Sequence, residues 1–302
     1  MANVNKDTFG GILKNATITL ILTVIFIIGL FIRSAKAQKD EMPSQQHENF
    51  DRNNFDNPTN MTNEWMPLNP GTRYIYEGTT LSDENEPLSH RVEIHVTDLT
   101  KEIDGINTVV AWDLDYSDEQ LVEAELAFFA QDNDGNIWRM GEYPVEYEEG
   151  KVIAAPCWIS GIDSAVAGIS MRGNPEIGSP SYSQGWGPGV GFTDRGQVYQ
   201  FEPETCVPLD CYKHVLIIRE TALSEPDAFQ LKYWAKGVGN IRVGWGGGGE
   251  KTQEILELVE IQKLDPEALA EVRKKAKKLE EHAYEFSKNV YGKTSPVTLS
   301  EE

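Results

Sequence analysis

The stretch LVEAELAFFAQDNDGNIWRM, residues 121–140, decides the fold class of this chain. Residues 121–131 carry aliphatic and aromatic side chains in a run typical of a β-strand, and a second run begins at Ile137. Asp134-Gly135 lies between the two runs, and this dipeptide favours a tight hairpin because both residues tolerate the backbone angles of such turns. The stretch therefore predicts two antiparallel strands joined by a short turn.

The same pattern continues on both sides of this hairpin. Val92, Ile94 and Val96 alternate with other residues, which places their side chains on one face of a strand. Similar short runs, separated by turns, extend over residues 64–263. We therefore predict a mainly β domain over residues 64–263, built as an antiparallel barrel or sandwich. The other expected strands cover residues 72–77, 107–116, 143–148, 151–154, 195–204, 212–221, 228–236, 240–245 and 252–262.

One long segment, residues 155–194, interrupts the strand pattern. It is rich in proline and glycine, and irregular excursions of this length often cover or form a site. If the domain holds a ligand pocket, we expect this segment to contribute to it. Trp186 lies in one glycine-rich loop and Trp245 in another. Each of these indole rings either stacks on a ligand or packs back over the sheet.

The C-terminal region predicts the one helix of the folded body. Asp265-Pro266-Glu267 is a good helix start, since Asp265 can cap the helix and Pro266 fits its first turn. Apolar residues then recur at spacings of three and four, which predicts an amphipathic helix over residues 264–292, ended by Gly292. The helix either docks on the β domain or forms a seam with a partner helix. Residues 293–302 are expected to form a disordered tail.

The N-terminal region predicts export. Residues 16–32, ATITLILTVIFIIGLFI, contain no charge, follow Lys6 and Lys14, and precede the small-residue site Ala35-Lys36-Ala37. Residues 1–37 are therefore a signal peptide cleaved after Ala37, or a retained anchor that crosses the membrane as an apolar helix over residues 16–32. Either way, the rest of the chain lies outside the cytoplasm, secreted or anchored to the cytoplasmic membrane. Residues 38–63 are polar and are expected to form a spacer.

Charge and cysteine content limit the possible partners. The formal net charge of −21 argues against binding nucleic acid, which requires basic contacts to phosphate. In an oxidising compartment, Cys206 and Cys211 are expected to form a disulfide across a short turn. Cys157 is expected to be a small buried apolar residue.

Three blocks of sequence stand out by their motifs. The first block, residues 63–78, contains Pro-Leu-x-Pro-Gly; the second, residues 128–138, reads FFAQDNDGNIW; the third, residues 231–241, contains Lys-Gly-Val-Gly. Together, in this order, they resemble a family of uncharacterised bacterial exported β-rich proteins. The resemblance covers residues 55–262 and implies an exported β-rich protein, without implying a particular activity.

The sequence contains no established catalytic motif. Neither G-x-S-x-G nor H-E-x-x-H occurs, and Asp132-Asn133-Asp134-Gly135 matches only part of a calcium loop. His90 and His95 have opposite parity on one strand, so they should face opposite sides. Two acidic pairs, Asp113 with Asp115 and Glu123 with Glu125, each share one strand face, and we interpret both faces as exposed. No catalytic residue, metal ligand, cofactor or ligand-binding residue is assigned.

We therefore predict an exported, non-enzymatic envelope module that binds a small molecule or another envelope component. Two alternatives remain open. One is a hydrolase that uses carboxylates, with or without a metal ion. The other is a structural or assembly protein that uses its C-terminal helix as the contact.

Overall fold

The hairpin predicted at residues 121–140 is present as β4 (Gln120–Gln131) and β5 (Ile137–Glu148). Gly135 in the turn has a φ of 81°, which a residue without a side chain adopts readily. The carboxylate of Asp132 accepts hydrogen bonds from the backbone NH of Asn136 and from the indole NH of Trp138. The side chain of Asp132 therefore stabilises the turn.

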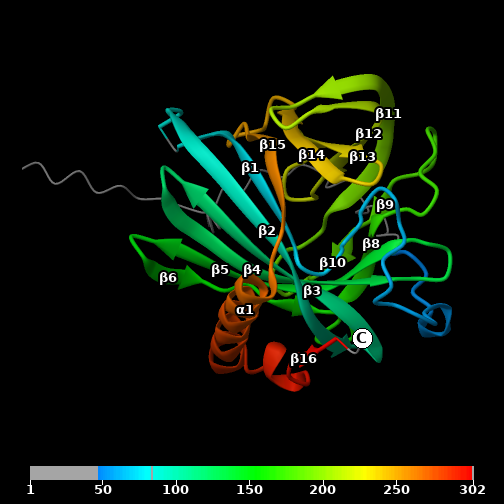
Figure 1. The fold of residues 1–302 in the computed structure, drawn as a ribbon, viewed down its shortest axis with the longest axis vertical. Helices are drawn as coiled ribbons and strands as arrows, with labels where there is room; N and C mark the ends of the chain where they lie inside the picture. The colour runs from blue at the N-terminus through cyan, green and yellow to red at the C-terminus, as the bar shows by residue number, and fades with distance from the viewer. Residues whose placement is uncertain (1–46, 83, 301–302) are drawn as a thin grey trace, which may run out of the picture. The chain divides into compact units, whose positions relative to one another are not determined.

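The structure is a computed structural model that describes residues 47–82 and 84–300. Its strands form one antiparallel sheet that curls into a nearly closed barrel (Figure 1). All of these residues belong to one unit, Lys36–Glu302. The mainly β class is thus confirmed. The sheet order is β10-β8-β5-β4-β3-β2-β1-β15-β14-β13-β12-β11-β9. The remaining strands are β1 (Thr72–Leu81), β2 (Pro87–Ile103), β3 (Ile106–Ser117), β6 (Lys151–Ala154), β7 (Trp158–Ile159), β8 (Val166–Met171), β9 (Tyr182–Ser183), β10 (Gly185–Trp186), β11 (Arg195–Cys206), β12 (Cys211–Thr221), β13 (Phe229–Ala235), β14 (Gly239–Gly246), β15 (Ile255–Lys263) and β16 (Thr298–Leu299).

A single short segment, residues 182–186, connects the two ends of the sheet. Its first part, β9, pairs with β11, and its last part, β10, pairs with β8. Gln184 is the residue between these two pairings. A side chain on Gly168 would bring its Cβ within 2.1 Å of the backbone nitrogen of Gly185. The segment therefore lies directly against β8, and we call residues 182–186 the closing segment.

The sheet separates two apolar cores. On β3, Val109 and Ala111 face the inside of the barrel, whereas Val110 and Trp112 face the outside. This alternation follows from the pleat of a strand, which points successive side chains to opposite faces. The outer core is covered by α1 (Pro266–Phe286), which packs across β2 and β4 (Figure 1).

The C-terminal helix docks on the barrel, as one of the two sequence interpretations expected. Asp265 caps it by accepting a hydrogen bond from the backbone NH of Ala268. Val272, Ala276 and Leu279 are buried against the outer core. The helix ends at Phe286, however, and the predicted end at Gly292 is wrong. Gly292 lies in a later 3₁₀ turn, Tyr291–Lys293, which directs the fully buried Tyr291 into the outer core.

Residues 293–300 are ordered, so the disordered tail predicted from residue 293 is wrong for this part. Val297 is buried, and β16 pairs with Thr100 and Leu99 of β2. A buried ion pair explains why these C-terminal residues adopt a defined structure. The amine of Lys101 donates to the carbonyl of Ser295 at 2.6 Å and to Glu280 at 2.9 Å. The backbone of residues 295–297 thus completes the hydrogen bonding of charges that burial would otherwise leave unsatisfied.

The described part of the expected spacer, residues 47–63, lies against the barrel. The rings of Phe50 and Phe55 have their centroids 5.3 Å and 6.1 Å from that of Trp138. A short 3₁₀ turn, Arg52–Asn54, lies between these two phenylalanines. The signal peptide or anchor and the apolar N-terminal helix predicted over residues 1–37 lie outside the described residues. Within residues 47–300 as described, no helix has the length and apolar character needed to span a membrane.

Candidate functional site: a cavity inside the barrel

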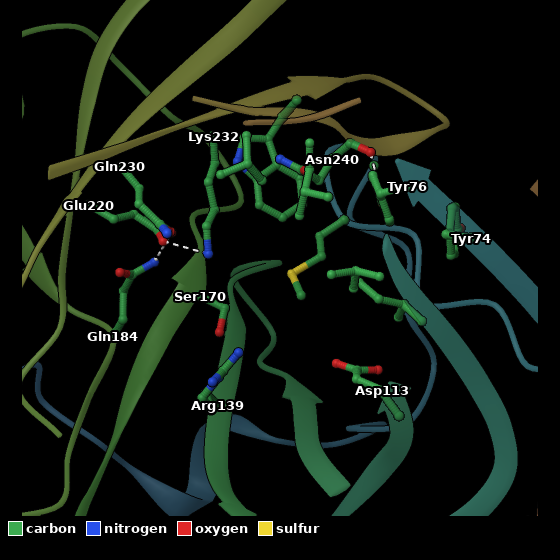
Figure 2. Close-up of a pocket in the computed structure, with 18 of the residues that line it drawn as sticks. Tyr74, Tyr76, Asp113, Arg139, Ser170, Gln184, Glu220, Gln230, Lys232 and Asn240 are labelled. Carbon is green, nitrogen blue, oxygen red and sulfur yellow. Dashed lines mark hydrogen bonds and ion pairs between the residues drawn. The ribbon is translucent and has the colours of Figure 1, made fainter. Parts of the chain in front are cut away.

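A cavity of about 290 Å³ lies inside the barrel, among the inward-facing side chains of the sheet (Figure 2). Part of its lining is apolar, and part is charged or polar. The segment that the sequence singled out, residues 155–194, contributes to the lining as expected. Its contribution includes Ser170, Gln184, Phe192 and Asp194. Apolar lining comes from Tyr74, Tyr76, Val92, Ile94, Trp234 and Leu256, and the other ionisable lining residues are Asp113, Arg139, Glu220, Lys232 and Glu254.

The first polar group joins the closing segment to β12, which lies one strand beyond its sheet neighbour β11. Glu220 on β12 accepts a hydrogen bond from the side-chain amide of Gln184 at 2.7 Å and pairs with the amine of Lys232 at 2.8 Å (Figure 2). Burial raises the pKa of Glu220, but the charge of Lys232 and the two hydrogen bonds lower it further, so the net shift is downward. Lys232 correspondingly has a raised pKa, because Glu220 outweighs its burial. Both groups are therefore charged at neutral pH.

The second group centres on His90. Its Nε2 lies 2.7 Å from Asp115, and its Nδ1 lies 3.4 Å from Glu254. Burial lowers the pKa of His90, but the hydrogen bond and charge of Asp115 and the charge of Glu254 raise it more. Gln230 also donates to Glu254, at 2.7 Å. The imidazole is thus held between two carboxylates.

The third group surrounds Arg139 on β5. Its guanidinium donates a hydrogen bond to Glu142 and lies 3.9 Å from Glu125. It also lies over the rings of Phe129 and Phe192, at 5.4 Å and 5.9 Å from their centroids. Burial raises the pKa of Glu125 well above its ordinary value, and the charge of Glu142 adds to this, although Arg139 opposes it.

Asp113 stands apart from these three groups. Burial raises its pKa to about 7, with Arg139 opposing the shift. Its Oδ1 is buried and has no hydrogen-bond partner among the described residues. Figure 2 shows this carboxylate directed into the space that Arg139 and Lys232 also face. Asp113 is therefore a half-buried acid whose Oδ1 is buried and has unused hydrogen-bonding capacity at the cavity wall.

Two further acids, Glu123 and Asp194, also have raised pKa values. Burial, followed by the charges of Asp115, Glu142, Glu146 and Asp113, raises the pKa of Glu123 to about 8. Burial, followed by the charges of Glu220 and Glu142, raises the pKa of Asp194 to about 6. Asp194 lines the cavity, where four carboxylates outnumber two cationic side chains, whereas Glu123 does not line it.

The sequence-based interpretation that the two acidic pairs on β3 and β4 are exposed is wrong. Asp113 and Asp115, like Glu123 and Glu125, do share a strand face, but that face is the inside of the barrel rather than an exposed surface. On β4, Glu125 has the same parity as Phe129, which is buried in the inner core. Because acids and a buried aromatic residue share one strand face, the sequence did contain a signal that this face is the inside of the barrel. Acidic residues are so abundant in this chain that the pairs were interpreted as ordinary surface acids.

The remaining sequence expectations concern residues outside the cavity. Cys206 and Cys211 form the predicted disulfide, and Cys157 is buried with a pKa raised to about 12, mainly by burial. His95 lies on the opposite face from His90, with Nδ1 3.1 Å from the carbonyl oxygen of Trp112. Trp186 and Trp245 are not among the cavity-lining residues.

No group of three or more His, Cys, Asp or Glu side chains in the described part of the chain is arranged to hold a metal ion.

No family model matches the chain, and no curated protein matches it. A solved structure from Bacteroides fragilis, described as an exported protein with a YmcC-like fold, aligns at 12% identity and a TM-score of 0.39, over 66% of this chain and 99% of its own. Another, from Parabacteroides distasonis and described as a lipoprotein, aligns at 10% identity and a TM-score of 0.34, over 65% of this chain and 97% of its own. Neither likeness carries information about a ligand or an activity.

Proposed function

We propose that this protein is an exported envelope module that binds one small molecule inside its barrel. The cavity of about 290 Å³, lined by both apolar and polar groups, is the observation that carries this proposal. Its volume lies near the lower end of the roughly 300–1,000 Å³ that is common for ligand sites. The apolar run at residues 16–32 and the small-residue site after it support export.

Unsatisfied hydrogen-bonding groups at the cavity wall support a bound molecule. Oδ1 of Asp113 and Nε1 of Trp234 are both buried without a hydrogen-bond partner among the described residues. A buried polar group without a partner costs about 1–3 kcal/mol of stability. A ligand that supplied an acceptor to Trp234 and a donor to Asp113 would recover this free energy. Such a recovery favours occupancy of the cavity by a polar molecule with an apolar portion.

The test combines native mass spectrometry with a cavity-filling variant. Protein purified from the envelope of its own cells should retain a small molecule, and the neutral fluorophore 2-(1-naphthyl)ethanol should bind to ligand-free protein. Ala111→Phe would place a ring in the cavity, because Ala111 is a lining residue, and should abolish both signals. Val152→Phe, on the exposed edge strand β6, is the matched control and should keep both. The absence of a retained molecule together with no fluorophore binding would overturn the proposal.

A hydrolase is the second candidate, and one cross-strand pair favours it. Asp113 and Glu125 lie directly opposite each other on β3 and β4, and both have raised pKa values. A carboxylic acid that keeps its proton near neutral pH can serve as a general acid. Hydrolysis of a panel of p-nitrophenyl esters and glycosides that disappears in both Asp113→Asn and Glu125→Gln would favour this candidate over simple binding.

A further inference from the structure

We propose that the ligand of the cavity is a small organic cation, an amine or quaternary ammonium group attached to an apolar body, with its charge against Asp113. This inference rests on the proposed function, because it names the class of molecule that the same cavity takes. Three observations carry it: the balance of charge around the cavity, the unpaired state of Asp113, and the apolar surface beside it.

The charge balance leaves acids without basic partners. Four carboxylates and two cationic side chains line the cavity. Lys232 is committed to Glu220 at 2.8 Å, and Arg139 is committed to Glu142 and Glu125. His90, just behind the lining, is held between Asp115 and Glu254. No basic group facing the cavity in the described residues is therefore left without a carboxylate partner.

Asp113 and Asp194 receive none of these cations. Within the described ranges, neither carboxylate has an ion-pair partner within 4.0 Å. Asp113 is also directed into the cavity, where its Oδ1 lacks any hydrogen-bond partner. A charged carboxylate that is removed from water requires an opposite charge or several hydrogen bonds. A cation in the cavity would supply the charge that the protein does not.

The surface beside Asp113 suits the apolar body of such a ligand. Register across β1, β2 and β3 aligns Tyr74, Ile94 and Asp113 in one row. The hydroxyls of Tyr74 and Tyr76 donate to the carbonyls of Pro67 and Asn240. Since these hydroxyls are engaged elsewhere, the two tyrosines present their rings rather than further donors. Aromatic rings attract organic cations through their π-faces.

An organic cation fits better than a metal ion. No set of three metal-ligating side chains is grouped in the residues that the structure describes. A volume of about 290 Å³ also exceeds what a single ion requires, since a water molecule occupies about 30 Å³ of liquid. The apolar lining would give a bare metal ion no ligands. A molecule with a charged head and an apolar body uses both parts of the lining.

The experiment compares three probes of similar shape by isothermal titration calorimetry on ligand-free protein. They are 2-(1-naphthyl)ethylamine, 2-(1-naphthyl)ethanol and 3-(1-naphthyl)propanoate, which differ mainly in charge. We expect the amine to bind roughly tenfold or more tightly than the alcohol, because a close charge pair contributes more than one factor of ten in affinity. Asp113→Asn should bring the amine to the affinity of the alcohol. Asp118→Asn, on an exposed turn, should leave the preference unchanged.

A proton-release measurement on the wild-type chain covers the case in which Asp113→Asn fails to fold. The titratable and charged groups that face Asp113 are Tyr76 from β1, Glu123 and Glu125 from β4, and Arg139 from β5. Amine binding should release protons near pH 7 and should strengthen between about pH 6 and pH 8, because the carboxyl group must ionise to pair with the amine. Titrations in two buffers of different ionisation enthalpy measure this release.

The outcomes separate this inference from the proposed function. Equal binding of amine and alcohol, with no proton release, would overturn the cation and leave a small-molecule site. Preference for the propanoate would overturn it in favour of an anion held by Arg139 or Lys232. Calcium that competes with the amine in an Asp113-dependent way would overturn it in favour of a metal ion. If none of the probes binds and no molecule is retained by the native protein, the proposed function itself fails.

Discussion

The side-chain amide of Gln184 donates a hydrogen bond to the carboxylate of Glu220 at 2.7 Å, over the strand β11 that separates the closing segment from β12. Gln184 is the central residue of the closing segment, and Glu220 belongs to β12, which is not a sheet neighbour of that segment. The backbone NH of Gln184 also donates to the carbonyl of Asp194 at 2.8 Å. The closing segment is therefore secured from the cavity side as well as by its short strand pairings. The same bond positions Glu220 toward Lys232.

Replacing Gln184 should loosen the closing segment. A hydrogen bond to a charged group contributes about 1.5–3 kcal/mol, so Gln184→Ala should lower the free energy of unfolding by about that amount. Amide hydrogen exchange should accelerate most at residues 182–186. Gln262→Ala is the matched control, because Gln262 donates to Glu260 at the same 2.7 Å on the exposed surface. Equal losses of stability in the two variants would contradict the role of the buried bond.

The inward-facing acids should make the protein less stable as the pH rises from about 4 to about 8. The pKa of Asp113 rises from 3.8 to about 7 on folding, and that of Glu123 rises from 4.5 to about 8. Between the two values of each acid, the native state binds more protons than the unfolded state, so the free energy of unfolding falls with rising pH. His95 opposes this trend below about pH 6.5, because its lowered pKa favours the native state as the pH rises.

Asp113→Asn should remove part of this pH dependence. The gain in unfolding free energy over the wild type should be larger at pH 8 than at pH 5, by about 1–3 kcal/mol, since each pKa unit corresponds to about 1.4 kcal/mol. Urea titrations at both pH values measure the difference. Asp118→Asn, on the exposed turn after β3, serves as the control. An identical pH dependence in the wild type and Asp113→Asn would show that Asp113 titrates normally.

Breaking the buried pair between Lys101 and Glu280 should cost more than replacing it entirely. The side chains are 0% and 7% exposed, and Glu280 also accepts hydrogen bonds from Tyr291 and Val297. Glu280→Leu alone should lower the unfolding free energy by about 3–5 kcal/mol, because it leaves the charge of Lys101 buried and unpaired. The double variant Lys101→Met, Glu280→Leu should recover part of that loss. Chemical denaturation of Glu280→Leu, Lys101→Met and the double variant tests this. If the stability loss of the double variant equals the sum of the two single losses, the two side chains do not act as a pair.

Reducing the disulfide should lower stability without opening the barrel. Cys206 and Cys211 close a loop of only a few residues between β11 and β12, for which chain entropy predicts about 2 kcal/mol. The double variant Cys206→Ser, Cys211→Ser should therefore unfold at lower urea concentration and still bind 2-(1-naphthyl)ethanol. The wild type in reducing agent should behave like the variant. A loss of fluorophore binding on reduction would mean that the bridge also shapes the cavity.

Much of the fold could be predicted from local patterns, because hairpins are specified by nearby residues. Asp134-Gly135 and the runs around it predicted β4 and β5 correctly. The helix start at Asp265 was also predictable, since capping depends on a few adjacent residues. The end of the helix could not be predicted, because the chain stops being helical before Tyr291 so that this side chain can pack against β4 and β5. The order of residues 295–300 likewise depends on Lys101, which is distant in sequence.

The sequence indicates the site only in part, for a related reason. Alternation places Asp113 and Asp115 on one face, but it does not reveal whether that face meets water or the inside of a barrel. The answer depends on closure, and closure depends on the two short pairings around Gln184. Residues 155–194 were correctly expected to contribute to a pocket, whereas Trp186 and Trp245, for which stacking on a ligand was one of two interpretations, do not line the cavity. Trp234, inside a regular strand, lines the cavity instead.

The separation of two cores by one layer of strands has a consequence for how this protein can change over generations. On β4, Leu126 supports the contacts under α1, while its neighbour Glu125 faces the barrel interior. Neighbouring residues of one strand are therefore under different selective constraints. One residue is constrained by the stability of the outer core, and the next is constrained by the chemistry of the barrel interior. A lineage can alter every second residue of β3 and β4 and so change what the interior accepts, while the helix and its outer core stay as they are.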